Sequence, residues 1–454
     1  RSQPLLILAA GVTIYAPAII LATVLGWRLD MTVVGIGVLV IVYTVTGGSE
    51  AVSLTQKFQM GIIFVGMVTA FILLIFRLPE GLGFNEAAHV AGAMGKLQAV
   101  DYSFDPEKRY TLWSGLFGGL FLSLSYFGTD QSQVQRYIGG AALREGRLGL
   151  MFNAVMKVPM QFFILLIGAL LFVFYQFQPA PVFYNRVEWQ RHANGPNGAE
   201  FRAIEERHAQ LHAAKQETIR AWLEVRHHSD AAVQLAAREA MQAAEAETQA
   251  IRKEAKDLLL KHDPRAKVKD SDYIFIGFIL EQMPHGAIGL LVAVMFSAAL
   301  SSKAGELNAL GTTTTIDLWR QFRPLAAHDE RRNVRVAKWW TAIWGLVAIA
   351  FALYAGLAEN LIEAINIIGS IFYGVVLGIF LVAFFIKRVG GTAVFWGAVV
   401  SQTAIFVIYF LRLRFPVLDF SYLWYNVIGC AGCVVLAVLI QLMINLGGGK
   451  GRTA

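Results

Sequence analysis

Long apolar stretches recur along this sequence, and each is long enough to cross a lipid bilayer as a helix. Such a span needs about 20 mostly apolar residues, and in lipid its backbone must satisfy its own hydrogen bonds. Ten stretches meet this description: residues 4–27, 31–48, 54–77, 111–129, 148–176, 285–304, 335–356, 360–386, 391–412 and 421–445. We therefore predict an all-α polytopic membrane protein with about ten spans.

The composition supports this prediction. Of the 454 residues, 56% are hydrophobic and only 16% are charged, whereas soluble proteins have about 25% charged residues. The net charge of +7 comes from basic residues between the spans, so it indicates contact with the lipid bilayer and no nucleic-acid partner. Cys430 and Cys433 lie in the last span. Their Cys-x-x-Cys spacing leaves a redox or metal role open, but burial in an apolar helix favours packing.

Basic residues in the loops predict the orientation of the chain. They are concentrated after the even-numbered stretches, at Arg136, Arg144, Arg147, Arg320, Arg323, Arg331, Arg332, Arg335, Lys338, Lys387, Arg388, Lys450 and Arg452. Loops rich in Lys and Arg face the cytoplasm. We expect a multi-pass protein of the inner or plasma membrane, with both ends of this chain cytoplasmic. Three basic residues within 78–110 are a mild counter-signal.

A block of different composition, residues 178–272, separates two transmembrane parts, 1–177 and 273–454. Residues 199–262 are rich in Ala, Glu, Gln, Arg and Lys, which predicts two long helices paired around residues 227–230. The topology places this block outside the cytoplasm, as an insertion or a docking element for a protein partner. The i, i+4 spacing of His208 and His212 suits zinc. No third ligand has a recognisable spacing, so a solvated surface is favoured.

The most informative polar stretch is Ala298-Ala299-Leu300-Ser301-Ser302, inside an apolar span. On a helix, Ala298, Ser301 and Ser302 share one face. The two hydroxyls and the accessible carbonyl of Ala298 suit a weakly bound monovalent cation, whereas a divalent ion would call for carboxylates. The alternative is close helix packing, with each hydroxyl bonded to its own i−4 carbonyl.

A second stretch, residues 111–129, contains four glycines together with Ser123, Ser125 and Tyr126. Its glycines predict a discontinuous helix that exposes backbone groups to a solute, with Tyr126 placed to stack on it. Tight packing and an interfacial tyrosine are the alternative. The residues after this span, Asp130, Gln131 and Arg136, are expected to form a local polar network.

Three motifs together resemble the sodium:solute symporter family, which includes the sodium–glucose cotransporters. They are YTVTGGSEAVSLTQKFQ (43–59), GTDQSQVQRY (128–137) and AALSSKAGELNALGTTTTIDLW (298–319). The resemblance covers nearly the whole chain outside the insertion. It implies a LeuT-type fold, with two inverted repeats of five helices and a site at the membrane midplane. In that fold the first span here matches the third core helix, so the first helices of the first repeat are expected to be missing from a truncated sequence.

The resemblance also implies particular site residues. Sodium is expected at the Ala298 carbonyl and the hydroxyls of Ser301 and Ser302, and the solute at Ser123 and Tyr126. Gln56 stands where members with a second sodium have an aspartate, and Ala304 and Gly305 stand where they have hydroxyls. These departures predict one sodium per cycle at most.

The expected function is sodium-coupled symport of a small polar solute, with sodium as the coupling ion and no cofactor. Neither a nucleotide-binding loop nor a hydrolase motif occurs, so the chain is not expected to be an enzyme. A transporter-like sensor and a proton-coupled transporter stay open as alternatives. The residues do not identify the solute.

Overall fold

The computed structural model describes most of the chain. The described residues are 14–15, 17–23, 25–46, 49–98, 100–138, 143–226, 230–264, 266, 268–322, 330–355, 361–412, 414–415 and 418–448. Within these ranges the side chains of 49–55, 57, 135–136, 138, 298–303, 320, 330, 354–355, 361–365 and 447–448 are not described. The secondary structure of this described part consists of helices, without a strand.

The helices follow the predicted apolar stretches and the insertion. They are α2 (Leu29–Thr46), α3 (Ser49–Phe76), α4 (Phe84–Ala93), η1 (Ser114–Gly118), α5 (Gly119–Thr129), α6 (Gln131–Ile138), α7 (Leu143–Phe177), α8 (Arg186–Ala193), α9 (Gly198–Val225), α10 (Ala231–His262), η2 (Ser271–Tyr273), α11 (Ile274–Gln282), α12 (His285–Thr313), η3 (Thr314–Trp319), α13 (Arg320–Phe322), α14 (Glu330–Ala355), α15 (Leu361–Phe385), α16 (Gly391–Leu411) and α17 (Leu423–Gly448).

Seven of the described helices are long and apolar enough to cross a membrane: α2, α3, α7, α14, α15, α16 and α17. Many of their large apolar side chains are exposed, including Phe385, Phe410 and Met443, as expected of surfaces that face lipid tails. The other three predicted spans differ for separate reasons. Half of the residues 4–27 lie outside the described ranges, 111–129 is divided between η1 and α5, and the described apolar part of α12 is the shorter segment His285–Ser297.

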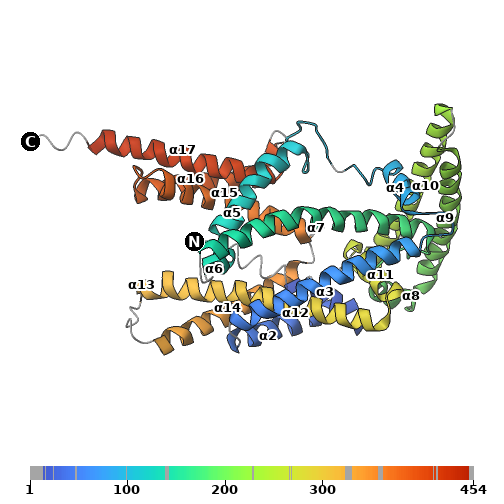
Figure 1. Ribbon diagram of the computed structural model, residues 1–454, viewed down its shortest axis with the longest axis horizontal. Helices are drawn as coiled ribbons and strands as arrows, with labels where there is room; N and C mark the ends of the chain where they lie inside the picture. Colours follow the sequence, from blue (N-terminus) through green and yellow to red (C-terminus); the bar gives the residue numbers. More distant parts are fainter. Residues whose placement is uncertain are drawn as a thin grey trace, which may run out of the picture.

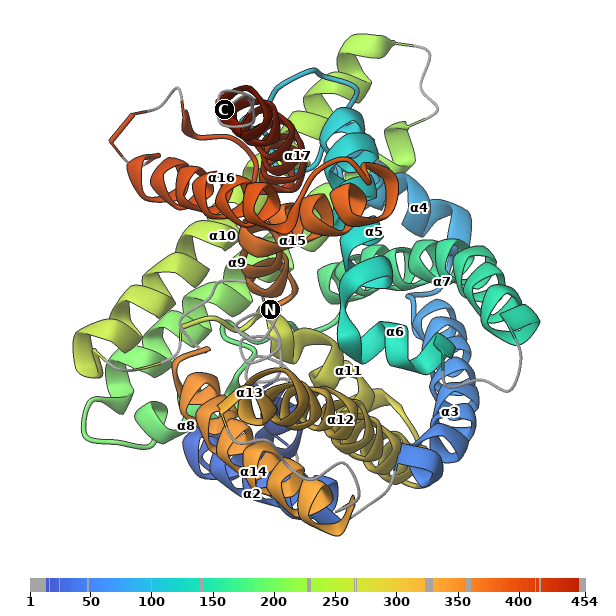
Figure 2. The ribbon, with the colours of Figure 1, turned by 90° about the vertical axis from the view of Figure 1, so that its left-hand side faces the viewer.

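The membrane helices form two groups joined by α5, α6 and α7. In the first group α17 packs against α15 and α16, and α5 packs against α15. In the second group α14 packs against α2 and α12, and α12 packs against α3. Figure 2 shows the first group above and the second below, with α5, α6 and α7 along one side between them. Two of the three motifs, 43–59 and 298–319, therefore belong to the second group, and the third, 128–137, lies on α5 and α6 between the groups.

Small residues bring the helices of the first group close together. Gly374 of α15 lies against the backbone of Asn426 on α17, and a Cβ atom at Gly378 would lie 2.7 Å from the Cβ of Cys433. Cys430 and Cys433 are buried, and both thiols are free. Their predicted packing role is confirmed.

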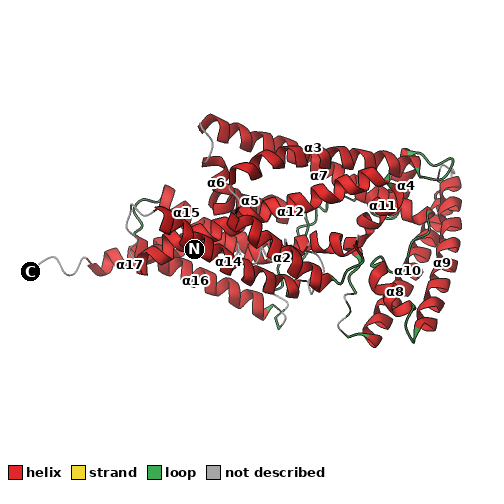
Figure 3. Ribbon diagram, turned by 90° about the horizontal axis from the view of Figure 1, so that it is seen from below, coloured by secondary structure: helices red, strands yellow, loops and turns green. Residues whose placement is uncertain are grey.

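The inserted block is a helical hairpin, as predicted. Helices α9 and α10 pack along each other, joined by ion pairs between Arg207 and Glu254 and between Lys215 and Glu245. Figures 1 and 3 show the hairpin standing across one end of the membrane helices, away from the end of α17. The turn at 227–229 lies outside the described residues.

Candidate functional site

The predicted ion-binding stretch lies on α12, which is one helix from His285 to Thr313. Its regular backbone places Ala298, Ser301 and Ser302 on a common face, as their spacing predicts. The side chains of these three residues lie outside those that the structure describes. What the structure establishes is their surroundings, because α12 packs against α2, α3, α6 and α14.

A buried hydrogen bond joins α12 to α3 beside this stretch. The Gln59 amide Nε2 donates to Ser297 Oγ at 2.6 Å, and Gln59 is 6% exposed. Gln59 is the last residue of the first family-like motif, and Ser297 immediately precedes Ala298. Two motifs that are far apart in the sequence therefore meet at the start of the predicted ion site. The sequence signalled Gln59 by its place in the motif, but it did not identify its partner.

The helix that carries the predicted solute contacts is continuous at these residues, so the predicted discontinuity within 111–129 is wrong. Its irregular part is the π-helical turn η1, and α5 continues from Gly119 to Thr129. A Cβ atom at Gly118 would lie 2.6 Å from the Leu423 backbone oxygen. This glycine therefore serves close packing against α17, which is the alternative that the sequence left open.

Ser123 and Tyr126 differ in their surroundings. Ser123 is exposed, whereas Tyr126 is partly buried. The Tyr126 ring packs edge-on against Tyr373 of α15, with centroids 6.3 Å apart, and against Phe127 at 5.1 Å. Tyr126 thus lies between α5 and α15, whereas Ser123 lies outside this packed contact.

The helix is interrupted at Asp130, between the end of α5 and the start of α6. Asp130 has extended backbone angles, φ −75° and ψ 120°. Its buried carboxylate accepts hydrogen bonds at Oδ1 from the Ser132 backbone N–H at 2.8 Å and the Ser132 hydroxyl at 2.7 Å. This is how an aspartate caps the first turn of a helix. The predicted polar network is confirmed for Asp130, whereas Gln131 is exposed and the Arg136 side chain is outside the described set.

Tyr373 is the residue that sequence reasoning missed. Its hydroxyl donates to Asp130 Oδ2 at 3.3 Å, its backbone oxygen accepts from the Ser125 hydroxyl at 2.7 Å, and its ring contacts Tyr126. Ser125 and Tyr373 are 248 positions apart, so no local pattern relates them. Through these contacts α15 fixes both Tyr126 and the break that starts α6.

Helix α6 links this cluster to the predicted ion stretch, because it follows α5 directly and also packs against α12. The arrangement has aromatic rings and neutral hydroxyls on the α5 side and the serine pair on α12. Chemically, such groups can stack on and hydrogen-bond a small polar molecule. They provide no nucleophile–base pair for covalent catalysis among the described contacts.

His208 and His212 of the hairpin are not on a solvated surface, which corrects the prediction for this pair. His208 and His212 are both buried, at the junction of α9 with α7. His212 donates from Nε2 to the Tyr175 backbone oxygen at 2.8 Å and accepts at Nδ1 from the Gln216 amide at 3.2 Å. Both of its nitrogens are occupied, so the pair does not offer two metal ligands. Burial lowers the pKa of His208 to about 4.

Comparison with known proteins identifies several similar chains. The model of the sodium:solute symporter family matches residues 5–188 and 263–401, leaving out most of the hairpin. Sodium-coupled monocarboxylate transporter 2 of Mus musculus is 25% identical in an alignment 487 positions long, which covers 98% of this chain and 64% of that protein. The human sodium/iodide cotransporter is 32% identical over 169 residues, 37% of this chain and 26% of that protein.

The chain thus spans about 64% of the length of the first of these relatives. Among solved structures, a substrate-bound, outward-open Na⁺-coupled sialic acid symporter has a TM-score of 0.61 at 21% identity, covering 97% of this chain and 74% of that one. This similarity confirms the predicted LeuT-type helical fold.

Proposed function

Because this chain belongs to the sodium:solute symporter family, we propose that it serves sodium-coupled symport of a small polar solute by alternating access. The family consists of sodium-coupled transporters and not of enzymes, and the spanning helices make this a multi-pass membrane protein. The observation that carries the proposal is the Gln59–Ser297 hydrogen bond. It joins two of the three family-like motifs next to Ala298.

The proposed sodium ligands are the Ala298 carbonyl and the hydroxyls of Ser301 and Ser302. Their common face on an unbroken helix supports this assignment, since a monovalent cation needs several neutral oxygen ligands and these three can supply one side of its coordination shell. Ala304 is buried and adds no side-chain oxygen one turn further along. We therefore keep the proposal of one sodium ion per cycle.

The proposed solute contacts are Ser123 and Tyr126. A hydroxyl and an aromatic ring offer one hydrogen bond and one stacking surface, and Tyr373 supports the ring from behind. The named relatives carry different solutes by their names, including monocarboxylates and iodide. The proposal therefore stops at a small polar solute.

Coupling requires that sodium and solute favour the same conformation of the protein, and the effect of each on the other must be equal. The path proposed here runs from α12 through α6 to the α5–α15 contact. Asp130 fixes the start of α6, so a shift of α12 against α6 would reach Tyr126 through a rigid link. The same proposal places both ends of this chain in the cytoplasm. It places the hairpin on the opposite side of the membrane.

Sodium binding can be tested without knowing the solute. The purified chain in detergent is heated while sodium replaces potassium at constant ionic strength. We expect saturable, sodium-specific stabilisation by mass action on the folded state, and its loss in the Ser301→Ala, Ser302→Ala double variant. Thr313→Ala on the same helix is the control, because that hydroxyl bonds to its own Ala309 carbonyl at 2.7 Å. Full sodium stabilisation in the double variant would rule out this site.

A further inference from the structure

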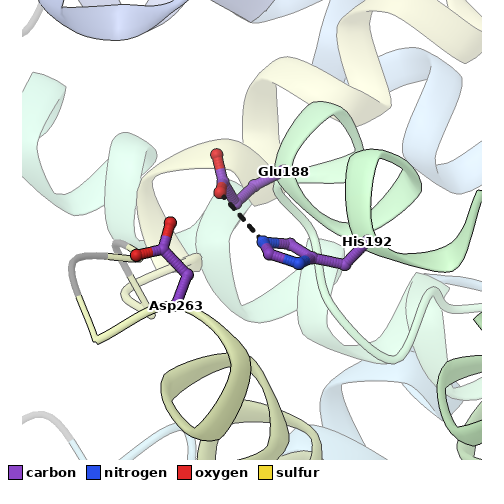
Figure 4. Close-up of side chains that lie close together, drawn as sticks. All are labelled: Glu188, His192 and Asp263. Atoms are coloured by element: carbon purple, nitrogen blue, oxygen red, sulfur yellow. Dashed lines mark ion pairs between the residues drawn. The ribbon is translucent and has the colours of Figure 1, made fainter. Parts of the chain in front are cut away.

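A cluster of potential metal ligands lies where the hairpin returns to the membrane part. Glu188 and His192 project from one face of α8, and Asp263 follows the last residue of α10. One ligand atom from each residue lies within 4.8 Å of the other two. Figure 4 shows the two carboxylates and the imidazole pointing toward a common centre.

His192 carries the strongest indication that this centre binds an ion. Its Nε2 atom is buried and has no hydrogen-bond partner, although buried polar atoms are nearly always paired. The same atom faces Glu188 Oε1 at 3.5 Å. The ring is held in this direction by Phe201, which stacks on it with centroids 5.6 Å apart and planes 15° apart. This nitrogen, which makes no hydrogen bond but faces the Glu188 carboxylate, therefore points into the cluster.

The spacing suits a tetrahedral metal ion. Ligand atoms about 2.1 Å from zinc stand about 3.4 Å apart at tetrahedral angles, close to the 3.5 Å between His192 Nε2 and Glu188 Oε1. Asp263 offers a carboxylate oxygen within 4.8 Å of both other ligand atoms. One imidazole and two carboxylates favour zinc or a similar transition metal over calcium or magnesium, which prefer oxygen ligands alone.

Neighbouring side chains and backbone groups hold the three ligand residues in place. Asn185 caps α8 by accepting the Glu188 backbone N–H at 3.3 Å, and Arg191 holds the second carboxylate oxygen of Glu188 at 3.0 Å. The Asp263 N–H donates to the Leu259 carbonyl at 2.8 Å, which fixes the end of α10. One oxygen of Glu188 is thereby left facing His192.

We propose that Glu188, His192 and Asp263 bind a divalent transition-metal ion, with zinc as the best match, and that this ion ties α8 to the end of α10. Three protein ligands leave a fourth position for water. The metal site is separate from the proposed sodium site, and it joins two parts of the inserted block, α8 and the end of α10.

Zinc itself is the probe for the test. The full chain in detergent is stripped with a chelator and titrated with zinc chloride by calorimetry. We expect one saturable site per chain that is weakened by about 100-fold or more in His192→Gln and in Asp263→Asn. His89→Gln is the matched control, because His89 is an exposed histidine on α4 and its loss should leave zinc binding unchanged. Magnesium should not compete.

Hydrogen exchange gives a second measurement. If the three residues had only a structural role, zinc would not change the exchange rates. Zinc should slow amide exchange in α8 and in the last turn of α10 of the unchanged chain, and not in Asp263→Asn. Equal exchange of both proteins without zinc shows that the variant is folded. Zinc affinity that is undiminished in both ligand variants, or no saturable site at all, overturns the proposal and leaves a His192–Glu188 ion pair as the role of the cluster.

Discussion

The hairpin and the α15–α17 group are both helical, but they are held together by different forces. The hairpin is attached through directed polar contacts: Arg226 to Glu86 at 3.1 Å, Arg252 to Asp270 at 2.6 Å, and the Arg238 and Gln242 side chains to the Ala93 carbonyl. The α15–α17 group is attached through glycines that let backbones touch, at Gly374, Gly378 and Gly397.

The difference follows from the two solvents. In lipid, helices gain nothing from hiding apolar surface, because the tails are equally apolar, so close contact of small residues must supply the attraction. A hairpin so rich in charged residues cannot rely on apolar area alone, and it uses ion pairs whose geometry fixes one docking position. We therefore expect the two regions to fail independently and in response to different substitutions.

The largest effect is expected from Asp270→Asn. Asp270 is buried, pairs with Arg252 and Lys256, and accepts the Tyr184 backbone N–H at 3.0 Å. Removing its charge takes away the carboxylate partner of both Arg252 and Lys256, and breaking a buried ion pair in this way typically destabilises by about 3–5 kcal/mol. Hydrogen exchange should accelerate over α8, α9 and α10 and stay unchanged over α15–α17.

The control for this experiment is Asp257→Asn, an exposed aspartate on α10, the helix that carries Arg252 and Lys256. Faster exchange throughout the chain in Asp270→Asn would show that the hairpin and the membrane helices unfold as one unit, against the comparison drawn above.

A second substitution tests the membrane group. A Cβ atom at Gly397 would lie 2.8 Å from the Ala437 backbone nitrogen, so Gly397→Ala forces α16 and α17 apart. Overpacking of this kind costs about 1–3 kcal/mol. Gly168→Ala in α7 is the matched control, because nothing lies within 4 Å of its Cβ position, and there alanine should stabilise the helix by about 0.5–1 kcal/mol.

Thermal unfolding in detergent measures both glycine variants. Stability changes of opposite sign for the two substitutions would confirm that Gly397 is needed for close contact between α16 and α17. They would also show that Gly168 makes no such contact in α7. A stabilised Gly397→Ala variant would mean that the two helices do not depend on backbone contact.

The smallest expected effect is a pH dependence confined to the hairpin. Burial lowers the pKa of His208 to about 4, against 6.5 when unfolded. The unfolded chain therefore binds more protons between these values, and stability falls as the pH drops below 6.5 and levels off below about 4. At pH 5.5 the loss relative to pH 7 is roughly 1 kcal/mol.

His208→Gln should reduce this loss, measured as exchange rates in α9 and α10 at pH 7 and pH 5.5. The α15–α17 helices serve as the internal reference in the same experiment. An identical pH response in the variant would assign the effect to other groups of the hairpin, such as His212, whose pKa burial also lowers.

The sequence by itself determined those features that depend only on residues close to one another along the chain. Apolar length fixed the spanning helices, because lipid permits few alternatives to a helix. Runs of Ala, Glu and Lys fixed the helices of the hairpin, and i, i+3, i+4 spacing placed Ala298, Ser301 and Ser302 on one face. The family-like motifs added the fold and the proposed ion.

Only the tertiary structure decided which distant residues meet. Tyr373 joins Ser125 and Asp130, Gln59 joins Ser297, and Asp263 reaches His192 on another helix. The tertiary structure also buries His208. From the sequence this residue was predicted to be solvated, because its neighbours are charged. These outcomes depend on how whole helices pack, and packing sums many weak contacts that no single stretch of sequence contains.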